Sequence, residues 1–130
     1  MQDQSTRSAF QALSGLLWQE RAELEGVLAA LREGPDEISG VARVGQARHL
    51  LSLLELQRCV TTQELARALQ LAGEPSLTRL IAYSPPGWAS VLRGHHTALA
   101  ALAGDVAAAE EKLLAGGPHE SQRSLAEFLA

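Results

Sequence analysis

The stretch FQALSGLLWQERAELEGVLAAL, residues 10–31, carries the pattern that predicts the fold. Residues at alternating spacings of three and four lie on one face of a helix, and six of the seven residues in this series are apolar. Two further leucines, Leu16 and Leu28, widen the face beyond a two-stranded seam. A wide apolar face favours a helical bundle. The series consists of Phe10, Leu13, Leu17, Glu20, Leu24, Val27 and Leu31.

Breaks in the pattern divide the remaining chain into helices of two lengths. Gly34 and Pro35 stop the first helix, and Asp36 is a suitable N-cap for the second. Thr61, followed three residues later by Glu64, has the pattern of a capping box and predicts a new helix there. We therefore expect long helices over residues 4–33, 37–60 and 86–114, and short ones over 61–71 and after Ser76.

These lengths predict an all-α fold, an elongated antiparallel bundle of three long helices with two short helices at the crossover. We expect one domain over residues 1–130, in which residues 119–130 are a candidate for a separate short terminal helix. The second half of the 37–60 helix is apolar on nearly every side, so we expect it to be the most buried part of the bundle. Its leucines are Leu50, Leu51, Leu53, Leu54 and Leu56.

Composition narrows the classes of partner. The formal net charge of −4 argues against nucleic acid and against an anionic membrane surface. Cys59 is the single cysteine, which favours a reducing compartment. No segment approaches the ~20 consecutive apolar residues of a membrane span. We expect a cytoplasmic protein without membrane insertion.

No combination of residues predicts catalysis, a cofactor or a metal. Helical metal sites need ligands three or four residues apart, and no two of the histidines (His49, His95, His96 and His119) have that spacing. Cys59 is interpreted as a small buried hydrophobic residue. Glu20 interrupts the apolar series, and we expect a solvated position there. A seam edge, or a buried pair with an arginine such as Arg21 or Arg93, is the alternative.

Residues 62–83 suggest a different class, a helix-turn-helix DNA-binding regulator. Ala66 is small where the two helices of such a unit would cross, but Gln70 stands where glycine is expected. Arg79 is the only cation of the would-be recognition helix, whereas phosphate contacts need clustered Lys and Arg. A structural, self-associating helical bundle is a further alternative.

Several short motifs resemble FlgN-type flagellar export chaperones of high-GC bacteria. The motif LLWQER at residues 16–21 lies in a leucine-rich first helix, as in that family. The motifs ELQR at 55–58, PSL at 75–77 and PGW at 86–88 follow the family's order and spacing. The resemblance covers most of residues 13–114.

The resemblance implies a non-enzymatic cytoplasmic chaperone of the flagellar type III export system. Such a chaperone would bind the amphipathic terminal helices of hook–filament junction proteins and prevent their premature assembly. The export apparatus is a further candidate partner, and the chain could act as a monomer or a dimer. From the residues themselves we predict an apolar triplet on one face of the terminal helix as partner-binding residues, with docking onto the bundle as the alternative. The triplet is Leu125, Phe128 and Leu129.

Overall fold

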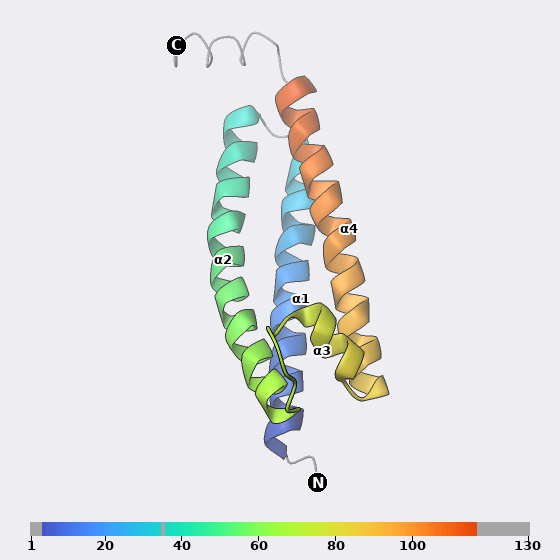
Figure 1. Cartoon of the computed structure of the whole chain (residues 1–130). Coiled ribbons are helices and arrows are strands. Elements are labelled where there is room, and N and C mark those ends of the chain that lie inside the picture. The colour runs from blue at the N-terminus through green and yellow to red at the C-terminus, as the bar shows by residue number, and fades with distance from the viewer. Residues whose placement is uncertain (1–3, 35, 117–130) are drawn as a thin grey trace.

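The computed structural model describes residues 4–34 and 36–116, which form four α-helices and no strand (Figure 1). Three helices are long and stand side by side, and the fourth is short and lies across the lower end of the group in Figure 1. The prediction of an all-α fold is confirmed. The helices are α1 (Gln4–Arg32), α2 (Glu37–Ala68), α3 (Leu77–Tyr83) and α4 (Pro86–Gly116).

The first helix is the centre of the bundle. α1 packs against both α2 and α4 along its length, whereas α2 and α4 make few contacts with each other. α2 runs antiparallel to α1, as expected, but α4 runs parallel to α1, because the chain crosses the bundle end through α3 before it turns back (Figure 1). The three long helices therefore run up, down and up, and each is antiparallel to the long helix that follows it in the chain.

The apolar series of α1 forms the core that the sequence predicts. Phe10, Leu13 and Leu17 are fully buried among residues of the other three helices. The ring of Phe10 stacks on Trp88 of α4, with centroids 5.1 Å apart, and ties the two parallel helices together. Val27 and Leu31 pack in a second cluster nearer the loop between α1 and α2. Leu24 is the member of the series that is only half-buried.

Two predicted helix starts are confirmed. The Asp36 carboxylate accepts a hydrogen bond of 2.7 Å from the backbone N–H of Ser39, which lowers the pKa of that carboxyl group. The Ser76 hydroxyl accepts one of 3.1 Å from the backbone N–H of Arg79. Both caps satisfy backbone donors that have no partner within the helix.

The predicted break at Thr61 is wrong, and with it the short helix expected over residues 61–71. α2 continues without interruption to Ala68, and the Thr61 hydroxyl donates to the carbonyl of Gln57 at 3.0 Å. A threonine within a helix can satisfy its hydroxyl on the carbonyl four residues earlier, so the capping pattern has a second solution. The chain leaves the helix at Gln70, whose φ of 58° is in the left-handed region.

The leucine-rich half of α2 is not the most buried part of the bundle. Leu54 points into the core, but Leu50, Leu53 and Leu56 are 40%, 46% and 65% exposed. Cys59, predicted to be buried, is also exposed. The reason is the arrangement of the helices, since α1 covers one side of α2 and no helix of the described chain covers its outer side (Figure 1).

The polar member of the α1 series is buried and paired across the bundle. Glu20 is 6% exposed, and its Oε2 atom lies 3.0 Å from Nε of Arg58 on α2, in an ion pair without the alignment of a hydrogen bond. The expected solvated position is therefore wrong, whereas the alternative of a buried pair with an arginine is confirmed, with Arg58 as the partner in place of Arg21 or Arg93. Burial raises the pKa of Glu20, Arg58 opposes that shift, and the nearby Glu55 adds to it.

We predict that Arg58→Leu lowers the free energy of unfolding by about 2–3 kcal/mol at neutral pH, because it leaves a buried carboxylate without its counter-charge. The deficit should shrink as the pH falls through the raised pKa of Glu20, where the carboxyl group becomes neutral in the folded protein. Urea unfolding at several pH values measures both effects.

The control for this prediction is Arg48→Leu, which removes the partner of Glu110 in an exposed ion pair. We expect a change below about 0.5 kcal/mol there, because water screens such pairs. Equal losses in the two variants would contradict the role of the Glu20–Arg58 pair.

Candidate partner-binding site

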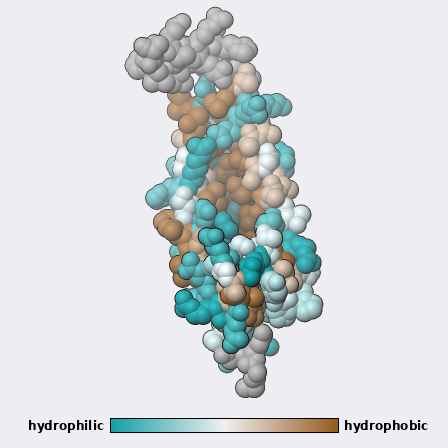
Figure 2. Space-filling model, in the orientation of Figure 1, coloured by the Kyte–Doolittle hydropathy of each residue, from teal (hydrophilic) through white to brown (hydrophobic). Residues whose placement is uncertain are grey.

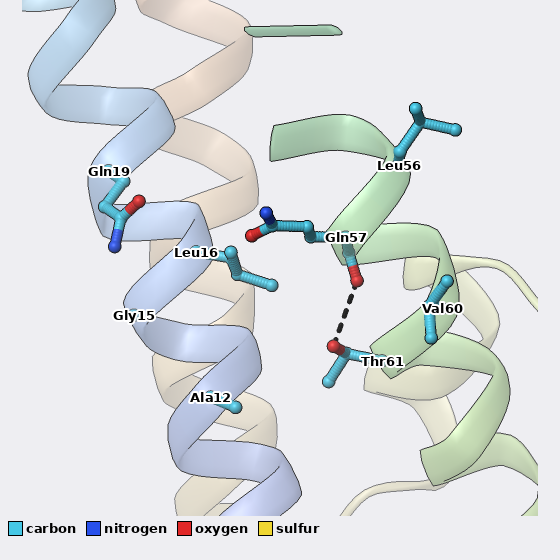
Figure 3. A pocket seen from close by; sticks show the side chains of 8 residues that line it. All are labelled: Ala12, Gly15, Leu16, Gln19, Leu56, Gln57, Val60 and Thr61. Carbon is cyan, nitrogen blue, oxygen red and sulfur yellow. Dashed lines mark hydrogen bonds between the residues drawn. The ribbon is translucent and has the colours of Figure 1, made fainter. Parts of the chain in front are cut away.

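A groove lies between α1 and α2. It has a volume of about 640 Å³, and each of the two helices contributes four lining residues (Figure 3). Figure 3 shows Leu16 and Gln57 extending toward each other from the two walls. The lining residues are Ala12, Gly15, Leu16, Gln19, Leu56, Gln57, Val60 and Thr61.

Small residues on α1 create the space. Ala12 and Gly15 lie on the wall that faces α2, and a Cβ atom built on Gly15 would meet no other atom within 4 Å. A glycine inside a helix costs stability relative to alanine, and here no tertiary contact requires it. The consequence is a shallow wall that another backbone can approach closely.

The lining of the groove is uncharged and largely apolar. None of its eight lining residues carries a charge, and none titrates near neutral pH. The Thr61 hydroxyl is engaged within α2, so the side-chain amides of Gln19 and Gln57 are the main polar groups on offer. Apolar surface with two adaptable amides suits the apolar face of a polypeptide.

The groove continues onto an apolar surface of α2, which we call the α2 flank and define as Leu50, Leu53, Leu56 and Val60. All four residues are among the large hydrophobic residues that the fold leaves exposed, and two of them line the groove. Sequence reasoning placed these leucines in the core. The sequence signal for this exposed surface is that α2 is apolar on nearly all sides, because such a helix needs partners on two sides to bury its apolar residues.

A smaller groove of about 200 Å³ lies between α2 and α4, with α1 as its floor. In Figure 2 hydrophobic residues form a band down the middle of this face, over the space between the two helices. The ion pair of Arg48 and Glu110, 3.4 Å long, bridges the groove and limits its depth.

A buried histidine joins α1 to α4. Nε2 of His95 lies 3.1 Å from the Ser14 hydroxyl, and Nδ1 lies 3.2 Å from Nη1 of Arg21. Because a guanidinium can only donate, Nδ1 accepts and Nε2 carries the proton, which makes the ring neutral. Burial lowers the pKa of His95, and the charge of Arg21 lowers it further. Trp18 covers the cluster, with its ring 6.2 Å from that of His95.

The residues predicted as partner-binding sites, Leu125, Phe128 and Leu129, lie outside the described residues. In the segment suggested as a helix-turn-helix unit, residues 62–68 do not form a separate first helix, because they are the end of the 32-residue helix α2. Arg79 of α3 lies over the ring of Tyr83, with its guanidinium carbon 5.6 Å from the ring centroid.

Among residues 4–34 and 36–116, no three His, Cys, Asp or Glu side chains gather to hold a metal ion.

Comparison with family models, with curated proteins and with solved structures finds no match to this chain. In the part of the chain that the structure describes, no helix combines the length and apolar character needed to cross a bilayer.

We predict that the lowered pKa of His95 makes the protein less stable as the pH falls from 7 to 5. As the pH falls, the unfolded chain takes up a proton on this histidine near pH 6.5, before the folded protein does. The contribution of His95 to the free energy of unfolding is therefore present above that pH and is lost below it. His95→Asn should flatten the pH profile of the urea midpoint. His96→Asn, at an exposed neighbouring position, should keep the slope of the wild type.

The raised pKa of Glu20 acts in the opposite sense over part of this range, so the difference between each variant and the wild type is the informative quantity. Identical profiles for the His95 and His96 variants would show that His95 does not titrate differently in the folded protein.

Proposed function

We propose that the protein is a helix-binding chaperone, whose groove between α1 and α2 takes the apolar face of a client helix. The observation that carries this proposal is the uncharged groove beside an exposed, continuous α2 flank. Monomeric soluble proteins rarely leave contiguous apolar surface of this kind without a use.

The shape of the surface supports a helix as the bound element. The α2 flank and the groove extend together over residues 50–61, about 17 Å along the helix axis, which is about three turns. Leu53, Leu56 and Val60 are three or four residues apart and present anchors about one turn from each other. That spacing suits a partner helix with apolar residues at the same intervals.

The resemblance described above supports the identity of the client. Its motif at residues 16–21 supplies Leu16 and Gln19 of the groove, and its motif at 55–58 supplies Leu56 and Gln57. The clients we propose are hook–filament junction proteins of the flagellum, bound in the cytoplasm before type III export. Covering their terminal helices would prevent premature assembly.

The proposed mechanism needs no cofactor and no covalent step. A terminal segment that is disordered alone becomes a helix on the groove, and the ordering cost keeps its binding reversible. Because no lining residue is charged, the client face that enters is expected to be apolar and uncharged as well.

Substitution of Gly15 by leucine tests the groove. The side chain would fill the space between the walls, and a Cβ at this position meets nothing in the free protein. We expect at least a tenfold loss of affinity for peptides carrying the terminal helices of hook–filament junction proteins from the source organism, measured by fluorescence anisotropy. Thermal unfolding should show no loss of stability, because leucine is the better helix former.

The matched control is Gly94→Leu on α4, where a Cβ also meets nothing within 4 Å. This variant makes the same gain in helix propensity away from the groove, so its affinity should equal that of the wild type. Equal affinity of the Gly15 and Gly94 variants would remove the groove from the proposal. A wild-type protein that binds none of the peptides would reject the proposed clients.

A further inference from the structure

The outer side of α2 carries a second apolar stripe that runs well beyond the groove. Its members follow one another at spacings of four, three, four, four, three and four residues, so they form one straight face of the helix. All are exposed, and Ile38 at the far end is 83% exposed. The outer stripe consists of Ile38, Ala42, Gly45, His49, Leu53, Leu56 and Val60.

We infer that a second copy of this chain packs antiparallel along the outer stripe, with the two-fold axis at His49. This inference goes beyond the proposed function and does not depend on it. A client helix on the groove and the α2 flank covers only Leu53, Leu56 and Val60 of the stripe, so the half from Ile38 to His49 needs another partner.

The order of residue sizes along the stripe carries the inference. Counted outward from His49 in both directions, the stripe places Gly45 opposite Leu53, Ala42 opposite Leu56, and Ile38 opposite Val60. In an antiparallel pair each small residue therefore meets a leucine of the second copy. Alternation of large and small residues across an interface lets two helices interdigitate at close distance.

The structure leaves room for this packing. A Cβ atom on Gly45 would meet nothing within 4 Å in the single chain, so this position can receive Leu53 of the second copy. A parallel pair in the same register would instead set leucine against leucine and glycine against glycine, which produces clashes and voids in alternation. Size complementarity selects the antiparallel pair.

The electrostatics are compatible with association. The stripe contains no Lys, Arg, Asp or Glu. The two arginines beside its first half are already paired within the chain, Arg43 with Glu23 at 2.6 Å and Arg48 with Glu110 at 3.4 Å. Neither arginine therefore lacks a carboxylate partner when the second copy binds.

The length of the stripe predicts a weak dimer. From Ile38 to Val60 it extends about 33 Å. One pair of helices of that length buries less than the about 1,600 Å² of a standard interface, so we expect dissociation in the micromolar range. Since Leu53, Leu56 and Val60 belong to both surfaces, a client helix and the second copy compete, and the dimer covers these three residues of the α2 flank while no client is bound.

A disulfide across the two-fold axis tests the geometry. In a Cys59→Ser background, His49→Cys places one cysteine per chain at the axis, and mild oxidation should give a disulfide-linked dimer on a non-reducing gel. The native Cys59 is the internal comparison, because the antiparallel pair separates its two copies by about 30 Å along the helix axes. Cross-linking through Cys59 in the wild type, or none through residue 49, would overturn the inference.

Sedimentation equilibrium tests the packing without a cross-link. The wild type should pass from 13.8 kDa to twice that mass as concentration rises. Gly45→Leu fills the space for the partner leucine and should weaken association at least tenfold, whereas Gly94→Leu should leave it unchanged. A wild type that stays monomeric up to millimolar concentration, or equal association of both variants, overturns the dimer. Peptide binding by Gly45→Leu would then still report separately on the proposed function.

Discussion

The central position of α1 is the constraint on which the rest of the structure depends. Its buried face holds α2 on one side and α4 on the other, through contacts such as Leu13 and Leu17 in the core. Because α1 lies between them, α2 and α4 cannot bury each other's apolar sides. α2 is apolar on two sides but packs extensively only on α1 within the described chain, so its leucine-rich flank stays exposed. The groove, the α2 flank and the outer stripe all follow from this arrangement.

Helical periodicity predicted well what is local to one helix. The buried series of α1 and the caps at Asp36 and Ser76 follow from spacing and from side-chain oxygens at helix starts. The prediction for Thr61 is wrong because a threonine hydroxyl can cap the start of a new helix or bond within a continuing one, and only the packing of α2 on α1 decides between the two. Periodicity shows that a side of a helix is apolar but not what covers it, so the burial of Leu53 and Leu56 was overestimated.

The candidate site was partly visible in the sequence. Two of the quoted motifs contain Leu16 and Leu56, but nothing local shows that they lie on facing walls. Gly15 becomes informative only once its open surroundings are known, and Arg58 could not be named as the partner of Glu20 without the pairing of α1 and α2. The expected triplet of Leu125, Phe128 and Leu129 stays a prediction, because it lies outside the described residues.

Methyl NMR of a Leu- and Val-labelled protein is the most direct test of the claim that the open side of α2 receives a partner helix. On addition of a peptide with a terminal helix of a hook–filament junction protein, the account predicts the largest shifts at Leu16, Leu56 and Val60, with Leu51 and Val106 of the α2–α4 groove nearly unchanged. Shifts confined to Leu51 and Val106, or no shifts at saturating peptide, would contradict it.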